Sequence, residues 1–235
     1  MSTTYNQLHK MIETVADALG DDLLKQVAFV GGCTTGLLMT DEFSKESVRY
    51  TDDVDLIINL VGYSSWVTLQ EELGKKGFVV SMEDDVNCRM RLGELKVDFM
   101  PDDEKILGYS NRWYAKALET AQDYQLTDQL SIRLLTAPFF VATKLEAYNG
   151  RGGNDPLGSR DLEDILSLFD GREEIVKEIQ NADADVQNYI AEQIAVLMKH
   201  QDFDYAVQGN TRGDSGRIDL IFERLENVSA MAGDD

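Results

Sequence analysis

The sequence has few of the residues that build disulfide frameworks, histidine sites or zinc sites. Its 235 residues include two cysteines, Cys33 and Cys88, and two histidines, His9 and His200. Two cysteines without metal-ligand spacing predict no disulfide framework, and a reducing cytoplasm is the expected location. Two histidines so far apart also argue against a histidine metal cluster and against a histidine-based catalytic triad.

Basic residues and long apolar runs are scarce as well. Lys and Arg number 22 against 43 Asp and Glu, and the formal net charge is −21. This charge disfavours a broad nucleic-acid face, because affinity for polyanions rests on Lys and Arg. Residues 75–116 hold as many basic as acidic residues, so contact with a short nucleic-acid end stays open. The lack of a twenty-residue apolar run or a basic, apolar leader argues against a membrane span and against secretion.

Apolar residues make up 43% of the chain, enough for one large domain or two small ones. Periodicity predicts one or two helices over 5–26, interrupted near Gly20, a short strand over 27–30 and a helical segment over 34–40. Between the last two lie Gly31 and Gly32. A strand, two glycines and a helix can form a phosphate-binding loop, although an ordinary turn explains most Gly-Gly pairs.

Acidic residues then enter a segment that is otherwise typical of a buried strand. In an extended chain Asp53 and Asp55 share one face with Thr51, while the apolar residues between and after them face the other side. An Asp-x-Asp pair on a solvated edge would be unremarkable by itself. In a buried strand, each carboxylate needs a cation, a donor or a proton.

A third carboxylate, Asp98, lies in a later strand whose opposite face carries Val97 and Phe99. Three carboxylates on one sheet face would repel one another unless divalent cations lay between them, and Mg²⁺ suits such ligands. Other elements are predicted from periodicity and turn residues. They are a helix over 64–75 with Ser64 or Ser65 as N-cap, strands over 78–82, 88–92 and 94–100 with a hairpin at Gly93, a mostly helical stretch over 103–120, and strands over 123–126 and 131–135.

The second half of the chain is acidic and predicted to be helical. Thr136 is a candidate N-cap with Pro138 in the first turn, and the helix that follows carries Lys144. After a glycine-rich loop over 150–158, further helices are predicted. They begin near 159–161 and continue over 173–180, 186–200 and 218–228.

Three blocks of this sequence resemble the DNA polymerase β-like nucleotidyltransferase superfamily. They are Val30-Gly31-Gly32, Asp53-Val54-Asp55-Leu56 and Val97-Asp98-Phe99. The spacing Arg49-x-Thr51-x-Asp53-x-Asp55-Leu56 is similar more narrowly to the AbiEii-like branch, which includes MenT-type toxins of toxin–antitoxin systems. A second stretch resembles that branch's Lys-Leu-x-Ala, Arg, Arg-Asp-x-x-Asp pattern. It comprises Pro138 to Ala147 with Lys144, then Arg151, then Arg160-Asp161-Leu162-Glu163-Asp164-Ile165.

The resemblance implies a metal site. Asp53 and Asp55 would hold two Mg²⁺ ions, or Mn²⁺ in their place, that bridge a nucleoside triphosphate such as ATP. Asp98 would complete the shell of the catalytic ion and help to activate the acceptor hydroxyl.

It also implies nucleotide contacts. Gly31, Gly32 and Thr34 would bind phosphates, with Thr34 or Thr35 replacing the serine hydroxyl that many superfamily members carry in place of the second glycine. Arg49 and Thr51 would assist. Lys144 would balance triphosphate charge, and Asp161 would orient Lys144 or the base. For Arg160 and Asp164 a buried Arg–Asp brace is an equally good interpretation.

The fold implied is α/β. A nucleotidyltransferase-type mixed sheet with flanking helices would form a catalytic domain over 1–136, and a helical domain over 137–235 would close the active-site cleft. The activity implied is transfer of a nucleoside monophosphate from an NTP to an acceptor hydroxyl. The tRNA 3′ end would be the acceptor of a toxin with an antitoxin partner. The acidity of the chain favours a small molecule, such as an aminoglycoside-like metabolite, or a protein hydroxyl. A non-catalytic nucleotide-binding or partner-binding module is the remaining alternative.

Two further motifs invite other interpretations. Gly213-Asp214-Ser215-Gly216 mimics a serine-protease signature, but no histidine accompanies it in a plausible context, and the overlapping Arg212-Gly213-Asp214 is predicted to be an exposed turn. Cys33 beside the glycines is either a reactive thiol or, more commonly for this residue type, a small buried side chain.

Overall fold

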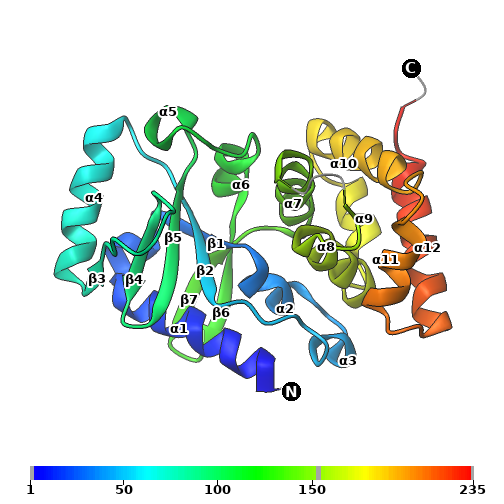
Figure 1. The fold of residues 1–235 in the computed structure, drawn as a ribbon, viewed down its shortest axis with the longest axis horizontal. Helices are drawn as coiled ribbons and strands as arrows, with labels where there is room; N and C mark the ends of the chain where they lie inside the picture. The colour runs from blue at the N-terminus through cyan, green and yellow to red at the C-terminus, as the bar shows by residue number, and fades with distance from the viewer. Residues whose placement is uncertain (1–2, 152–154, 234–235) are drawn as a thin grey trace. The chain divides into compact units, whose positions relative to one another are not determined.

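The structure is a computed structural model that describes residues 3–151 and 155–233, without the side chain of Arg151. Its internal contacts divide the chain into two compact units. The sheet unit comprises Ser2–Thr34 and Arg49–Thr136, and the helical unit comprises Thr35–Val48 and Ala137–Asp235. Figure 1 colours the chain from its N-terminus to its C-terminus and labels its elements. Each unit has its own buried core and is described separately.

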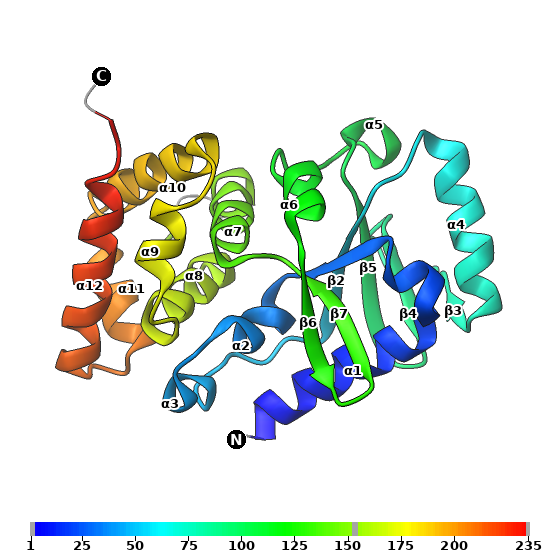
Figure 2. The same cartoon turned by 180° about the vertical axis from the view of Figure 1, so that it is seen from behind.

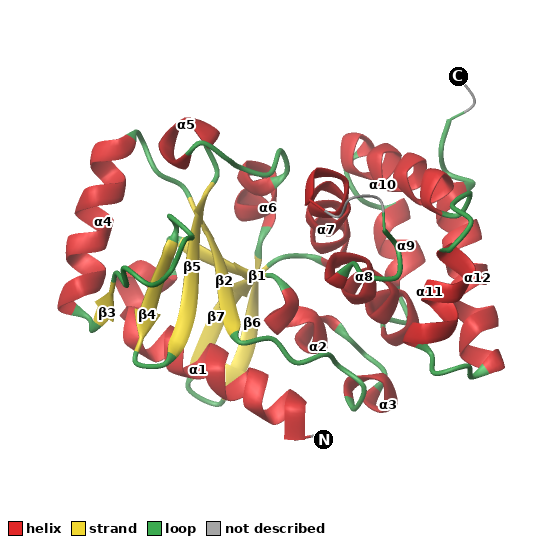
Figure 3. Cartoon of the chain, in the orientation of Figure 1, coloured by secondary structure: helices red, strands yellow, loops and turns green. Residues whose placement is uncertain are grey.

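Within the described ranges, the strands form one seven-stranded mixed sheet in the order β3-β4-β5-β2-β1-β7-β6. Figure 3 shows that all of them belong to the sheet unit. The strands are β1 (Val27–Val30), β2 (Asp53–Ile58), β3 (Phe78–Val79), β4 (Arg89–Leu92), β5 (Leu95–Pro101), β6 (Gln122–Thr127) and β7 (Leu130–Leu134). The α/β class and the mixed sheet predicted from the sequence are confirmed.

Helices flank this sheet. They are α1 (Thr3–Leu24), the 3₁₀ turn η1 (Gly32–Thr34), α4 (Tyr63–Lys75), α5 (Glu104–Leu107) and α6 (Tyr114–Thr120). Helix α1 runs along β1, β2 and β7, as Figure 2 shows from behind, and buries apolar residues at helical spacing from Leu8 to Leu23. Its backbone is non-helical at Gly20, where φ is 66°, so the predicted interruption is confirmed.

Cross-strand register aligns residues from the strands at the centre of the sheet. Strand β1 is antiparallel to β2 and pairs Val30 with Asp55. Strand β2 is parallel to β5 and pairs Asp55 with Asp98, and β5 is antiparallel to β4 and pairs Asp98 with Arg89. Side chains of directly paired residues lie on the same face of a sheet. Asp55, Asp98 and Arg89 therefore form a row across three adjacent strands.

The alternation predicted for the acidic strand is present. Val54 and Leu56 are fully buried, while Asp53 and Asp55 on the other face are half-buried. On β5, Val97 and Phe99 are fully buried in the same way. Because the apolar face is fixed in the core, a slip of one residue would turn every acid inward, and this fixes the register.

The helical unit packs its helices around buried Phe140, Leu145, Phe169 and Ile190. Its elements are α2 (Thr35–Leu38), α3 (Glu42–Lys45), α7 (Ala137–Arg151), α8 (Arg160–Gly171), α9 (Ile175–Gln180), α10 (Ala184–Leu197), α11 (Phe203–Asn210) and α12 (Ser215–Ser229). Helix α7 contacts α8, α9 and α10, which makes α7 the centre of this unit.

The segment Thr35–Val48 belongs to this unit by its contacts, although the sequence predicts it within a domain over 1–136. The amides of Thr40 and Asp41 donate to the carbonyl of Gly171 at 2.8 and 2.9 Å. Arg217 on α12 donates to the carboxylates of Asp41 and Asp170, at 2.7 and 2.8 Å. Arg217 therefore ties α12 to the segment and to α8.

Several local predictions were wrong. Helix α4 begins at Tyr63 after Gly62, whose φ is 78°, and neither Ser64 nor Ser65 is its N-cap. Strand β3 comprises only Phe78 and Val79 and ends before the predicted boundary at residue 82. The stretch 103–120 is mostly helical, as predicted, but a turn in which Gly108 has a φ of 82° divides it into α5 and α6. Helix α11 was not predicted. None of the helices in the described ranges is long and apolar enough to cross a membrane.

Candidate functional site

Three carboxylates gather on one face of the sheet unit. Asp53, Asp55 and Asp98 each offer one oxygen, and these oxygens lie within 4.8 Å of one another. The register explains the grouping, since Asp55 is paired directly with Asp98 and Asp53 is two residues along β2. Asp98 is the most enclosed of the three and is 7% exposed. The predicted convergence of these residues on one sheet face is what the structure shows, and we call them the acid triad.

The acid triad also contacts a cation that sequence reasoning missed. Arg89 donates from Nε to Asp98 Oδ1 at 2.7 Å and from Nη2 to Asp98 Oδ2 at 2.8 Å. Its Nη2 also reaches Asp53 Oδ2 at 3.4 Å. The hydrogen bond with Asp98, despite burial that acts in the opposite sense, raises the pKa of Arg89. The predicted hairpin could have identified Arg89 as the partner of Asp98, because a two-residue turn at Gly93-Glu94 places these two residues opposite each other.

Thr51 and Arg49 precede the triad along the chain. The Thr51 hydroxyl donates to the Asp53 carboxylate, and Thr51 is 8% exposed. Thr51 therefore orients an acid of the triad. Arg49 donates to the backbone carbonyl of Tyr50 at 3.2 Å. The nucleotide contacts expected of Thr51 and Arg49 stay predictions.

The glycine loop lies against the triad. Gly31 has a φ of 78°, and a Cβ atom placed on it would lie 1.8 Å from Asp55 Oδ2. Only glycine fits there, both because the backbone is left-handed and because the Asp55 carboxylate occupies the space of a side chain. The structure thus brings Gly31 and the acids together in one unit, as the sequence pattern predicts. Gly32 is buried at the start of η1.

Thr34 closes the loop through its own backbone. Its amide and hydroxyl both donate to the Gly31 carbonyl, at 3.1 and 2.9 Å. The hydroxyl therefore holds the loop in shape, and its predicted phosphate contact is untested. The neighbouring Thr35 hydroxyl is buried and has no hydrogen-bond partner within the part of the chain that the structure describes.

Two ion pairs lie beside the triad without joining it. Lys96 binds Asp52 at 2.7 Å, and this hydrogen bond lowers the pKa of Asp52. Arg91, two residues after Arg89 on β4, holds Asp84 through two hydrogen bonds of 2.7 and 3.0 Å. Each pair joins an aspartate outside the strands to a basic residue on β4 or β5, so Asp52 and Arg91 provide controls for Asp53 and Arg89.

The other predicted site residues lie in the helical unit. Lys144 Nζ on α7 contacts Asp161 Oδ1 at 3.0 Å and Asp164 Oδ2 at 2.7 Å on α8. All three are buried. Asp161 thus contacts Lys144, as predicted. The buried Arg–Asp brace is wrong for Arg160, which is exposed, because Asp164 pairs with Lys144 instead. The side chain of Arg151 lies outside the described part.

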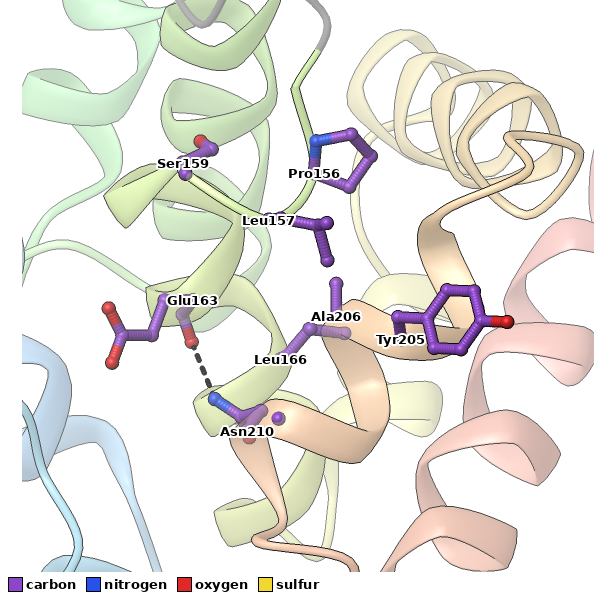
Figure 4. A pocket seen from close by; sticks show the side chains of 10 residues that line it. Pro156, Leu157, Ser159, Glu163, Leu166, Tyr205, Ala206 and Asn210 are labelled. Carbon is purple, nitrogen blue, oxygen red and sulfur yellow. Dashed lines mark hydrogen bonds between the residues drawn. The ribbon is translucent and has the colours of Figure 1, made fainter.

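A pocket of about 250 Å³ opens in the helical unit, away from these residues. Figure 4 shows it between the loop before α8 and the side chains of α8 and α11. Leu157, Tyr205 and Glu163 line it, and Asn210 donates to the backbone carbonyl of Glu163 at 3.3 Å. Neither Lys144 nor Asp161 belongs to its lining.

Two other motifs have structural explanations. Asp214 is the N-cap of α12, and its Oδ1 accepts from the amide of Arg217 at 3.1 Å. Arg212-Gly213-Asp214 thus lies in an exposed turn, as predicted, and α12 begins at Ser215, three residues before the predicted helix start at residue 218. Cys33 is 2% exposed and donates to the Val30 carbonyl at 3.4 Å, which supports the prediction of a small buried side chain.

The donor set of the triad fits a hard divalent cation. Carboxylate oxygens are the ligands that Mg²⁺ takes in proteins, at about 2.1 Å, so two oxygens on one ion lie at most about 4.2 Å apart. The triad oxygens, within 4.8 Å of one another, need only small side-chain rotations to share an ion.

No model of a known protein family matches this chain, and a search of curated proteins finds no match either.

Proposed function

We propose that the protein is a Mg²⁺-dependent nucleotidyltransferase of the DNA polymerase β-like type. One observation carries the proposal. The register of β2 and β5 sets Asp55 beside Asp98, and a left-handed glycine loop packs directly on the Asp55 carboxylate. A loop with a side-chain-free residue next to clustered acids suits a ligand that brings both phosphate groups and divalent cations.

Asp53, Asp55 and Asp98 would hold the Mg²⁺ ions in this proposal. Bound Mg²⁺ would neutralise the negative charge of the triphosphate and orient its α-phosphate. In the reaction, the acceptor oxygen forms a bond to the α-phosphorus while the bond from that phosphorus to the bridging oxygen breaks, and pyrophosphate leaves. Asp98, which is the most enclosed acid, would help to remove the hydroxyl proton.

Residues of the glycine loop would bind the nucleotide. Gly31 and Gly32 would contact phosphates through the backbone. The Lys144 ammonium, which Asp161 and Asp164 hold in place, would balance phosphate charge.

A transfer assay tests the activity. The protein is incubated with Mg²⁺, each α-labelled NTP in turn and a total cellular extract, and the label is followed into RNA, protein and small-molecule fractions. The wild type should transfer label to one fraction, and Asp53→Asn should lose at least about a hundredfold of the rate because it removes a metal ligand. Asp52→Asn is the matched control, since Asp52 pairs with Lys96 outside the triad, and its rate should stay within about twofold.

Equal rates for the two variants, or no transfer to any fraction, would contradict the proposal. If NTP binds with Mg²⁺ but no label moves, the protein is a nucleotide-binding module without catalysis. A labelled RNA fraction would favour the tRNA 3′ end as the acceptor, and with it a toxin role and an antitoxin partner.

The net charge of −21 favours a small-molecule or protein hydroxyl as the acceptor. Salt dependence separates these acceptors from RNA. Transfer to RNA should fall steeply as salt rises, because bound counterions are released from phosphates, while transfer to an uncharged acceptor should change little. The slope of the rate against salt, measured for the labelled fraction, decides between them.

A further inference from the structure

Arg89 occupies a position that the proposed chemistry leaves unexplained. It lies on β4, directly opposite Asp98 on β5, and its planar guanidinium engages both oxygens of that carboxylate at 2.7 and 2.8 Å. Its side chain is 14% exposed and that of Asp98 is 11% exposed, so the pair is shielded from water. Two parallel N–H···O bonds make this the stronger type of ion pair, with a fixed geometry.

The guanidinium also touches a second acid of the triad. Arg89 Nη2 lies 3.4 Å from Asp53 Oδ2, so one cation spans acids from β2 and β5. A divalent cation shared by Asp53 and Asp98 would need the same carboxylate oxygens. It would also lie within a few ångströms of a positive charge, and like charges repel strongly where water is excluded.

We propose that Arg89 is the internal counter-cation of the acid triad, and that it competes with divalent cations for Asp98. Before metal binds, Arg89 holds the carboxylates together against their mutual repulsion. If a divalent cation bound to Asp98, Arg89 would lose part of its hydrogen bonding to that carboxylate. Arg89 is thus a positioning residue that keeps intrinsic metal affinity low, so that the phosphates of a nucleotide are needed to complete a tight site. This inference rests on the metal site of the proposed function.

Mn²⁺ alone, without nucleotide, tests the competition. Free Mn²⁺ is counted from its electron paramagnetic resonance signal while the protein is titrated. Removing the competing cation in Arg89→Met should lower the dissociation constant for Mn²⁺ by about tenfold or more. A residue that only supported the fold would weaken binding when removed, so the direction of the change discriminates between the roles.

Arg91→Met is the matched control, because Arg91 lies two residues along the same strand and holds Asp84 in the same bidentate manner. Its Mn²⁺ affinity should stay within about twofold of wild type.

In an Asp98→Asn background, Arg89→Met should give a much smaller gain in Mn²⁺ affinity, since the competition acts through the Asp98 carboxylate. If Arg89→Met does not fold, Arg89→Lys is used instead. It keeps the positive charge but loses the two parallel hydrogen bonds of the guanidinium, and it should bind Mn²⁺ more tightly than wild type, by a smaller factor than expected for Arg89→Met.

Unchanged or weaker Mn²⁺ binding in Arg89→Met, or in Arg89→Lys where only that variant folds, would overturn the inference. A gain that persists fully in Asp98→Asn would overturn it too, and so would absence of Mn²⁺ binding in all of these proteins. The transfer assay separates this failure from failure of the proposed function. If label transfer requires Asp53 while Mn²⁺ affinity is unchanged in Arg89→Met, the role of Arg89 is wrong and the proposed transferase activity still holds.

Discussion

In the sheet unit, carboxylates from two strands share one face, whereas in the helical unit two carboxylates one turn apart on α8 hold Lys144 between them. The sheet unit gathers three carboxylates that are distant in sequence around Arg89, which contacts two of them. The helical unit pairs opposite charges from adjacent helices. The comparison teaches that the helical unit sets two carboxylates around one lysine, while the sheet unit sets three around Arg89 and so keeps more like charge together, which a divalent cation would reduce.

The largest expected effect tests the helical side of this comparison. Lys144→Met should lower the free energy of unfolding by about 3–5 kcal/mol, because it leaves two buried carboxylates without this cation. Urea denaturation followed by circular dichroism measures the change. Lys199→Met, at an exposed position after α10, should stay within about 0.5 kcal/mol. A loss below about 1 kcal/mol for Lys144→Met would show that the Lys144 pairs are not a brace.

The next effect tests how tightly the sheet unit packs its loop on the triad. Gly31→Ala should cost about 3 kcal/mol, from about 1–2 for a left-handed backbone and about 1–3 for overpacking against Asp55. Gly93→Ala has the same kind of backbone, with a φ of 59°, but nothing within 4 Å of its Cβ. It should cost only about 1–2 kcal/mol. Equal losses in urea denaturation would mean that the Asp55 carboxylate moves away freely.

Neutralising one carboxylate in each unit should shift the thermal midpoint in opposite directions. Without metal, Asp53→Asn should raise the thermal midpoint by a few degrees, because it removes like charge from the triad. Asp164→Asn should lower the midpoint by a similar amount, because it weakens a buried pair of 2.7 Å with Lys144. Differential scanning calorimetry in a chelating buffer gives both values. Shifts in the same direction would remove the distinction between the two units.

The smallest effect concerns the tie between α12 and the segment Thr35–Val48. Hydrogen bonding to Arg217 is the main reason that the pKa of Asp41 falls from 3.8 to about 2. Since the folded pKa is the lower one, the stabilisation from Asp41 is complete above about pH 4 and is lost as the pH falls toward 2. The difference in thermal midpoint between wild type and Asp41→Asn should therefore shrink between pH 5 and about pH 3. A constant difference across that range would contradict the assignment.

Much of the sheet unit could be predicted, because strand alternation and turn residues are local signals. The strand over 27–30, the hairpin at Gly93 and the face shared by Asp53 and Asp55 are all present. The convergence of Asp98 with them needed only the expectation that buried acids meet. Arg89 was missed because its meaning depends on register across a hairpin, not on its neighbours in sequence.

The helical unit was harder to predict in detail. Helix α11 runs from Phe203 to Asn210 and buries only Phe203 and Val207, too few positions to give a clear period. The pairing of Lys144 with Asp164 as well as Asp161 depends on how α7 packs against α8, which is a tertiary outcome. The grouping of Thr35–Val48 with these helices is also tertiary, since no local pattern marks it.

That grouping limits how the protein can be dissected. Cutting the chain after Thr136 would release a C-terminal fragment without Asp41 and Ser44, two of the side chains that Arg217 binds. The same cut would leave Thr35–Val48 on the other fragment, where its apolar residues would be exposed because the helices that bury them are gone. Limited proteolysis at that junction should therefore leave two pieces that stay associated and co-elute, and each piece expressed alone should aggregate.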